Sequence, residues 1–239
     1  MMRTISRALV QPRYPSVGAR GTRGYAATAT QPFAPMSEEA AAEKSVVQGA
    51  DCERSSATAF PRTSESERLL RMRHTAAHVM AMAVQRLYPS AHVTIGPWVE
   101  HGFYYDFDCD TAFSSDDLKH IEKEMKRIIK SKQGLQMEEI SRDEAVRRIN
   151  ELGEPYKLEI LDDIPTDEAV TIYHIGDQWW DLCAGPHVEH TGELNPKALE
   201  LESVAAAHWR GDENRPMLQR IYGTAFETEE QLEVRTLSY

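Results

Sequence analysis

The sequence predicts an α+β fold with a largely antiparallel sheet and helices packed against it. Segments with helical periodicity and short segments with strand-like alternation follow one another without the regular strand–helix–strand repeat of a parallel sheet. The chain of 239 residues is 41% hydrophobic and 27% charged, which is typical of a globular protein. No apolar run is long enough to cross a bilayer.

The N-terminal residues 1–35 have the composition of an organellar transit peptide. They contain five arginines and abundant Ser, Thr and Ala, and the first acidic residue of the chain is Glu38. A disordered basic tail is the alternative interpretation. Residues 36–63 combine Pro, Ser, Glu and Ala without periodicity, so we expect a disordered linker there.

A helix is expected after this linker. Ser64 and Glu67 have the spacing of a capping box, and Pro89 marks the end of the helix. The expected apolar stripe consists of Leu69, Met72, Ala76, Met80, Ala83 and Leu87. His74 and His78 are one turn apart and face one point, away from the centre of that stripe. They face a ligand or a partner strand, or they are two solvated histidines on a surface helix.

In residues 92–95 and 103–107 apolar and polar side chains alternate, so we expect these two segments to pair as strands. The second contains Tyr104 and Tyr105, and the alternation of a strand sends only one of these rings into any site.

Two further helices are expected. The first opens at Ser114 or Ser115 and ends at Gly134, and the second opens at a capping box of Ser141 and Glu144. The strands expected around and after them cover residues 135–140, 171–175, 199–209 and 217–226, while residues 156–161 fit a strand or a short helix.

The segment QWWDLCAGPHVEH, residues 178–190, carries the densest set of reactive side chains. Its Gly-Pro step forces a sharp turn, which can bring Cys183 and His187 to one point. With His74 and His78 they offer three imidazoles and one thiolate, which is a plausible tetrahedral zinc set and equally a polar pocket for a hydrolytic water. A core thiol beside a surface histidine is the alternative.

Hydrolysis of an ester requires a positioned water, a group that accepts its proton and a donor for the developing oxyanion, and the chain contains candidates for the last two. The three imidazoles titrate near neutral pH and can act as base or orienting groups. Lys157 or a tyrosine hydroxyl could stabilise the oxyanion, and Asp181 could hold an amine or orient a histidine. From the sequence alone, however, Lys157 is more simply interpreted as a surface cation.

Charge is divided unevenly along the chain. Residues 1–65 carry 8 basic and 6 acidic side chains, and the remainder carries 19 basic and 32 acidic side chains. This acidic balance argues against a nonspecific nucleic-acid binder, so any RNA contact must be local. The candidate contacts are Lys157, Arg210, Arg215 and Arg220. The three cysteines are unpatterned, which argues against a disulfide framework.

Five motifs occur in a continuous order, RHTAAH, GFYYDFD, GEPYKLEIL, WWDLCAGPHV and AAHWRGDENRPMLQRIYGTAF. Together they resemble the second additional domain of threonyl-tRNA synthetases, which is the editing domain in that family. The resemblance sets the predicted domain at residues 64–228, and residues 229–239 resemble the start of a connecting helix. No class II catalytic core is recognisable, so ATP-dependent ligation is not expected of these residues.

The resemblance implies hydrolytic removal of serine wrongly attached to the tRNA for threonine. The positions matching the family's pocket are His74, His78, Tyr105, Lys157, Asp181, Cys183 and His187. Catalytic roles are implied for His74, His78, Lys157, Asp181 and His187, and substrate binding for Tyr105 and Cys183. The related alanyl-tRNA synthetase domains are similar in using HxxxH and CxxxH for zinc. A zinc ion on His74, His78, Cys183 and His187 is therefore possible, although we expect no cofactor to be required.

The implied partners are the aminoacylated acceptor end of the tRNA for threonine and a full-length threonyl-tRNA synthetase, with no membrane and no DNA. The segments WWDLCAGPHV and LNPKALELESVA are similar to plastid and cyanobacterial synthetases, which favours the chloroplast stroma over the mitochondrial matrix. A non-catalytic tRNA- or synthetase-binding module is the alternative function. It is disfavoured because such a module has no physical need for the full set of pocket residues.

Overall fold

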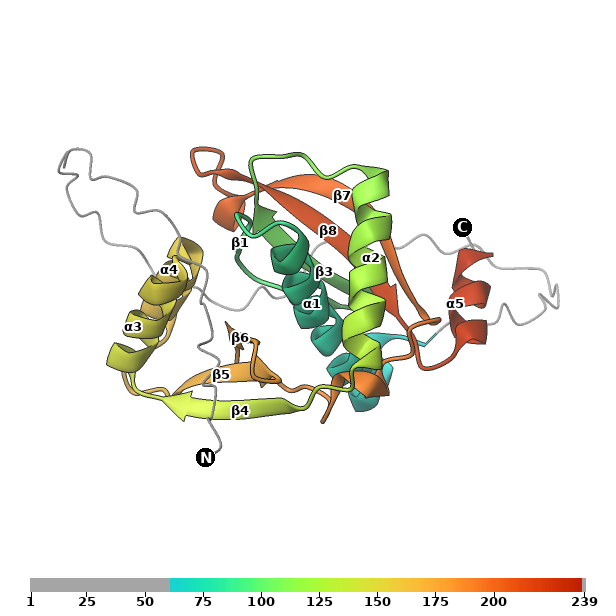
Figure 1. Ribbon diagram of the computed structural model, residues 1–239, viewed down its shortest axis with the longest axis horizontal. Helices are drawn as coiled ribbons and strands as arrows, with labels where there is room; N and C mark the ends of the chain where they lie inside the picture. Colours follow the sequence, from blue (N-terminus) through green and yellow to red (C-terminus); the bar gives the residue numbers. More distant parts are fainter. Residues whose placement is uncertain (1–60, 238–239) are drawn as a thin grey trace, which may run out of the picture. The chain divides into compact units, whose positions relative to one another are not determined.

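The computed structural model describes residues 61–237, which form an α+β unit whose strand pairs are antiparallel (Figure 1). This confirms the predicted fold class. The transit peptide and nearly all of the linker expected before residue 64 lie outside the described residues.

The larger sheet has five strands in the described part of the chain. They are β1 (His92–Val93), β2 (Trp98–Val99), β3 (Gly102–Asp108), β7 (Leu199–His208) and β8 (Met217–Ala225), in the order β1-β3-β8-β7 with β2 also paired to β3. Helices α1 (Glu67–Leu87) and α2 (Ser115–Lys130) pack against one face (Figure 1). Alternation along β3 sends Phe103, Tyr105 and Phe107 into that core, where each is 0% exposed.

A smaller sheet contains β4 (Leu135–Ile140), β5 (Val170–Ile175) and β6 (Trp179–Leu182). Helices α3 (Arg142–Leu152) and α4 (Pro155–Asp163) pack together and share an apolar cluster with β5. Residues 156–161 are therefore helical. Gly153 ends α3 in the left-handed region, at φ 73°, and Pro155 then starts α4. Lys157 is carried on the first turn of α4.

Short 3-10 turns and one terminal helix complete the unit. The turns are η1 (Thr63–Glu65), η2 (Thr191–Glu193) and η3 (Trp209–Gly211), and the helix is α5 (Glu229–Thr236). Helix α5 begins after a capping box at Thr228, within the segment expected to start a connecting helix.

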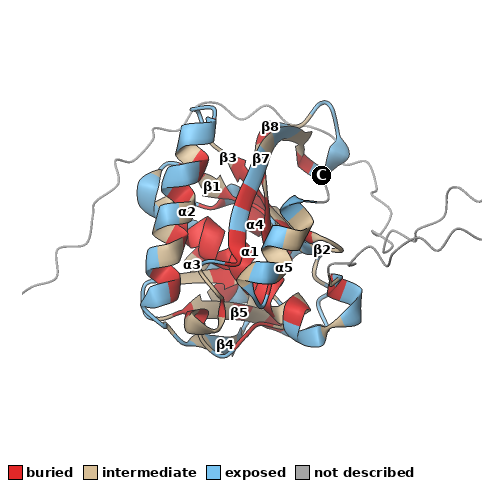
Figure 2. Cartoon of the chain, turned by 90° about the vertical axis from the view of Figure 1, so that its right-hand side faces the viewer, coloured by how far each residue is buried: buried red, intermediate tan, exposed pale blue. Residues whose placement is uncertain are grey.

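Helix α1 is buried around most of its circumference, as Figure 2 shows by its red ribbon near the centre of the fold. Ala77 and Ala81, beside the histidines, are 0% exposed, and His78 is only 2% exposed. The solvated alternative is therefore wrong for His78.

Three boundary details differ from the sequence expectation. The N-cap of α1 is Ser66, which accepts a hydrogen bond from the Leu69 amide, whereas Ser64 lies in η1 and donates to Glu100. Leu87 is the last residue of the helix and is 39% exposed, because the core ends before it. Helix α2 ends at Lys130, before the predicted end at Gly134. The left-handed residue after the helix is Lys132, at φ 50°, and not the expected Gly134.

Candidate active site

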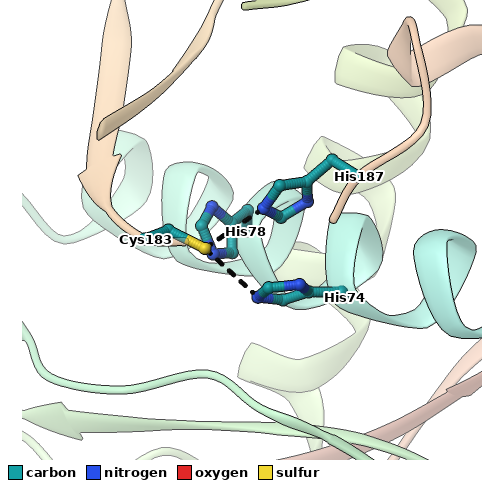
Figure 3. Close-up of side chains that lie close together, drawn as sticks. All are labelled: His74, His78, Cys183 and His187. Carbon is teal, nitrogen blue, oxygen red and sulfur yellow. Dashed lines mark hydrogen bonds between the residues drawn. The ribbon is translucent and has the colours of Figure 1, made fainter. Parts of the chain in front are cut away.

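Four side chains from two distant segments converge at one point (Figure 3). His74 and His78 come from α1, and Cys183 and His187 come from the loop after β6. Their candidate ligand atoms all lie within 4.8 Å of one another. Cys183 Sγ is 3.4 Å from Nε2 of His74 and 3.3 Å from Nε2 of His187. The alternative of a core thiol beside a surface histidine is wrong, because His187 is 5% exposed and contacts the thiol.

The turn between Cys183 and His187 depends on a glycine. Gly185 has φ 75°, in the left-handed region, and its amide donates a hydrogen bond to Cys183 Sγ at 3.2 Å. A Cβ atom at this position would lie 2.5 Å from the hydroxyl oxygen of Tyr173. The loop can therefore fold back onto α1 because this residue has no side chain.

Hydrogen bonds on the far side of two rings fix their orientation. His74 Nδ1 lies 3.1 Å from the Pro186 carbonyl oxygen, which can only accept, so Nδ1 carries the proton and Nε2 faces Cys183 as an acceptor. His187 Nδ1 lies 3.2 Å from the hydroxyl of Thr75, which also accepts from the Val188 amide. Thr75 was not singled out in the sequence, because a buried threonine inside a helix gives no local signal of such a contact.

A second, charged cluster adjoins the first. Tyr105 Oη, from β3, donates to Asp181 Oδ2 at 2.6 Å, and Lys157 Nζ donates to Tyr105 Oη at 3.1 Å. Lys157 also forms an ion pair with Asp181, and His78 Nε2 lies 3.7 Å from Asp181 Oδ2. The structure therefore brings all seven sequence-predicted site residues together. Tyr104 lies on the opposite face of β3, next to Tyr222.

The charged cluster is cut off from solvent. Lys157 is 4% exposed and Asp181 is 3% exposed, so the interpretation of Lys157 as a surface cation is wrong. A buried ammonium is tolerated because Asp181 supplies the opposite charge and Tyr105 accepts a further hydrogen bond.

Burial also keeps the imidazoles neutral. The pKa of His78 is held well below its ordinary value by burial, and then by the neighbouring His74 and Lys157. Burial likewise lowers the pKa of His187 and of His74. The pKa of Cys183 is raised to about 12, mainly by burial, so without a metal ion the group is a thiol at neutral pH.

The donor set fits a zinc ion. Ligands of one tetrahedral zinc lie about 3.3–3.8 Å apart, given bonds of about 2.0–2.3 Å, and the two sulfur–nitrogen separations in this cluster agree with that spacing. His74 donates its Nδ1 proton to a carbonyl, as metal-bound histidines commonly do. Among the described residues, His78 Nδ1 is a buried nitrogen without a hydrogen-bond partner. These four side chains could therefore hold a metal, which would also stabilise Cys183 as a thiolate.

The remaining arginines considered as RNA contacts are paired within the protein. Arg210 pairs with Asp163, and Arg215 with Glu159. Arg220 binds Asp106 through two hydrogen bonds. Their positions are explained by these carboxylates.

Two aromatic residues at the site were not predicted. The ring of Tyr173, from β5, lies 4.5 Å from the His187 ring, and the ring of Trp179, from β6, lies 5.7 Å from the His78 ring. Both occur in strands where aromatic residues are common, so their sequence context does not separate them from core residues.

The helices among the described residues include none that is both long and apolar enough to span a membrane.

The known proteins most similar in sequence to this chain include several threonine–tRNA ligases. The chain is 67% identical to a threonine–tRNA ligase of Thermosynechococcus vestitus over 173 residues, which are 72% of this chain and 28% of the ligase. It is 65% identical to that of Synechocystis sp. over 174 residues, covering 73% of this chain and 28% of the ligase. A chloroplastic/mitochondrial threonine–tRNA ligase of Arabidopsis thaliana is 57% identical over 206 residues, covering 86% of this chain and 30% of the ligase.

The chain thus spans less than a third of the length of these relatives. Residues 170–222, which include β5, β6, the Cys183–His187 turn, all of β7 and most of β8, match the family model described as the threonyl and alanyl tRNA synthetase second additional domain. The order of the sequence motifs, the antiparallel α+β fold and the threonine–tRNA ligase relatives all agree with this match. Residues 170–222 therefore belong to the family of the second additional domain of threonyl and alanyl tRNA synthetases, and the chain is related to threonine–tRNA ligases over 72–86% of its own length.

Proposed function

We propose that this chain is an aminoacyl-tRNA deacylase that hydrolyses the ester between serine and the tRNA for threonine. The observation that carries the proposal is a cluster of imidazoles kept neutral by burial directly beside the buried Lys157–Asp181 pair. Neutral imidazoles can accept the proton of a water, and a fixed ammonium can stabilise an oxyanion, which together are the requirements of ester hydrolysis.

The roles follow from exposure and charge. His74 is the more accessible helical imidazole, and its Nε2 is free of a proton, so it is our candidate for the base that takes the proton of the attacking water. Lys157 would stabilise the developing oxyanion, while Asp181 holds Lys157 and Tyr105 in place and attracts the substrate ammonium. His78 and His187 would orient the water. A zinc ion held by three of the four side chains His74, His78, Cys183 and His187 would keep one coordination position for a water, whose pKa it would lower.

The choice of serine has a physical basis. Threonine and serine differ by one methyl group, and an added or missing methyl changes binding by only about 1–3 kcal/mol, so one synthetic site discriminates poorly between them. A second pocket that admits serine and excludes the additional methyl of threonine would remove the error. The proposed partner is accordingly the acceptor end of the tRNA for threonine, with a full-length threonyl-tRNA synthetase as a second partner.

The test is to add the purified full chain to seryl-tRNA for threonine and to follow serine release and tRNA binding in parallel. We expect release well above the spontaneous rate. Binding without release would instead support the non-catalytic module, which is the alternative function.

We further propose that residues 1–35 direct the chain to an organelle, with residues 36–63 as a linker to the domain at 64–228. The relatives include cyanobacterial proteins and a chloroplastic/mitochondrial one, which agrees with an organellar origin. We favour the chloroplast stroma over the mitochondrial matrix. A fluorescent fusion of residues 1–60 should accumulate in one of these organelles, and a fusion that stays in the cytosol would contradict the assignment.

A further inference from the structure

The buried Lys157 lies on α4, a helix of only nine residues. A helix this short has little stability of its own, so its position depends on the elements packed against it. Its last two residues are Asp162 and Asp163, and negative charge at the C-terminal end opposes the helix dipole. The place of the Lys157 ammonium in the site therefore depends on what holds α4.

One face of α4 lies against the tip of the β7–β8 hairpin, residues 209–216. The residues of this face have the i, i+3, i+4, i+7 spacing of one helical stripe and are Tyr156, Glu159, Ile160 and Asp163. Tyr156 and Ile160 pack with Trp209 of the tip and with Leu218 of β8, and the rings of Tyr156 and Trp209 lie 5.2 Å apart. Lys157 belongs to the adjoining face of the helix.

Glu159 is the centre of the polar contacts between the hairpin tip and α4. Its carboxylate accepts a hydrogen bond from Trp209 Nε1 at 3.0 Å and forms an ion pair with Arg215. Its main-chain oxygen accepts from Arg210 Nη2 at 3.1 Å, and the same guanidinium pairs with Asp163. The two arginines thus bring to the C-terminal half of α4 the positive charge that stabilises this end of a helix.

The backbone of Arg210 is adapted to this contact. Its φ of 57° and ψ of 20° lie in the left-handed region, which residues with a side chain seldom adopt. Its guanidinium carbon lies 5.3 Å from the centre of the Trp209 ring, on the way to the carboxylate of Asp163. An uncommon backbone conformation persists where surrounding contacts hold it, and the contacts of this side chain are those to α4 and Trp209.

The same face of α4 is joined to the strand that carries Tyr105. The hydroxyl of Tyr156 donates to Asp108 Oδ2 at 2.6 Å, and Asp108 is the last residue of β3. Lys157 follows Tyr156 directly, and its ammonium donates to Tyr105 Oη at 3.1 Å. A displacement of α4 from the hairpin tip would therefore move the ammonium relative to the group it contacts on β3.

We propose that the hairpin tip is a clamp that sets the position of Lys157 through α4. Trp209, Arg210 and Arg215 are positioning residues, which act on the reaction by holding the helix that carries the ammonium. The proposal deepens the proposed function and rests on it, because it assigns to these residues a share of the rate that Lys157 supplies.

The test uses Glu159→Ala in the full chain, which removes the carboxylate shared by Trp209 and Arg215. The side chains of the ion pairs at this face are 37–56% exposed, so each pair contributes little to stability and the variant should fold. Single-turnover release of serine from seryl-tRNA for threonine should slow by about 5- to 20-fold, because the ammonium is misplaced. The enzyme concentration that gives half the maximal rate should change by less than about twofold. Glu159→Gln keeps an acceptor for Trp209 and should retain most of the rate.

Two further variants separate positioning from a general effect on the fold. In a Lys157→Ala background, Glu159→Ala should change the rate by less than about twofold, because no ammonium is left to position. Glu144→Ala is the matched control: Glu144 also pairs with two arginines, Arg147 and Arg148, but lies on α3. It should leave the rate unchanged. Circular dichroism of each variant checks that the fold is retained.

A second measurement does not depend on catalysis. The rate at which a small acylating reagent modifies Lys157 is followed by mass spectrometry, with Lys119, whose side chain is 77% exposed, as the reference in the same chain. Lys157 is 4% exposed and should react slowly in the wild type. Glu159→Ala should raise this rate several-fold relative to Lys119, and Glu144→Ala should not.

The outcomes distinguish the clamp from deacylation. No serine release by the wild type, together with the expected change in Lys157 modification, would contradict the proposed function and support the clamp. Serine release by the wild type, with a folded Glu159→Ala variant that matches it in rate and in Lys157 modification, would overturn the clamp. Equal effects of Glu159→Ala and Glu144→Ala would also overturn it, as would fully additive effects of Glu159→Ala and Lys157→Ala on the rate.

Discussion

The two helical histidines have the same spacing in the sequence but different surroundings. His78 is buried against Trp179 and lies close to Asp181, whereas His74 is partly exposed and its Nε2 faces Cys183. A base that meets a substrate from solvent must be accessible, which favours His74 for that role. His78 is better placed to connect the imidazole cluster with the charged cluster.

Cys183 separates a metal mechanism from a metal-free one. We expect chelators to leave serine release unchanged and Cys183→Ala to reduce it less than tenfold, because Lys157 and Asp181 already provide the charge that zinc would bring. Activity measured with and without a chelator, together with metal analysis of the protein, checks this. Stoichiometric zinc that is lost together with activity on chelation would contradict the expectation and assign the four side chains as ligands.

At the scale of single elements, the site depends on how α1, β6 and α4 are held together. Glu154, at the N-cap of α4, is 6% exposed and accepts hydrogen bonds from Gln85 of α1 at 2.6 Å and from the Val93 amide at 3.0 Å. Gln85 in turn accepts from Trp179 Nε1 at 2.7 Å. This chain of bonds fixes the first turn of α4 and thereby the position of Lys157.

The turn at Gly185 gives a prediction with a built-in control. Gly185 and Gly153 have similar φ angles, 75° and 73°, but an added Cβ meets Tyr173 only at Gly185 and open space at Gly153. Alanine at either position should cost about 1–2 kcal/mol of unfolding free energy through left-handed strain. Gly185→Ala should in addition reduce serine release by about 10- to 100-fold, because it displaces the loop that carries Cys183 and His187. Equal activities of the two variants in deacylation assays would contradict this account of the turn.

The start of α2 gives a pH-dependent prediction. Asp117 accepts hydrogen bonds from Ser114 and Tyr88, which lower its pKa from 3.8 to about 2. Because the folded pKa is depressed, its stabilisation is present above pH 3.8 and is lost as the pH falls towards 2. Asp117→Asn should therefore reduce the unfolding free energy at pH 7 by at most about 1 kcal/mol, since the residue is partly exposed, and by nothing near pH 2. Urea unfolding at several pH values measures this, with the exposed Asp167→Asn as the control.

Apolar periodicity and capping motifs predicted most helices and strands. They failed where contacts between residues distant in the sequence determine the structure. The apolar periodicity and caps of α2 and α3, and the strand at 135–140, agree with the structure because they depend on neighbours in sequence. The N-cap of α1 was placed two residues early, since Ser64 is used to contact Glu100. The HxxxH and CxxxH patterns identified four site residues, but the pairing of Lys157 with Asp181 and Tyr105 joins three elements and has no local signature. The chemistry of Lys157 and Asp181 made them candidates, but only the family resemblance placed them with Tyr105 in one pocket.

At the scale of the whole molecule, the site lies where the larger sheet, the smaller sheet and α4 meet around α1. Each contributes part of it: β3 provides Tyr105, α4 provides Lys157, and β6 with its following loop provides Asp181, Cys183 and His187. The arrangement buries Lys157 and Asp181 and leaves His74 and Cys183 partly exposed.

The central claim is that this buried cluster hydrolyses a serine ester and spares threonine. The most direct measurement is the single-turnover rate of amino acid release from seryl- and threonyl-tRNA for threonine, with the wild-type chain and with Lys157→Ala and His74→Ala. We predict rapid release of serine, little release of threonine, and a loss of about 10²-fold or more in each variant, the usual effect of removing an oxyanion donor or a general base. Serine release no faster than the spontaneous reaction in folded wild-type protein, or equal release of serine and threonine, would contradict the account.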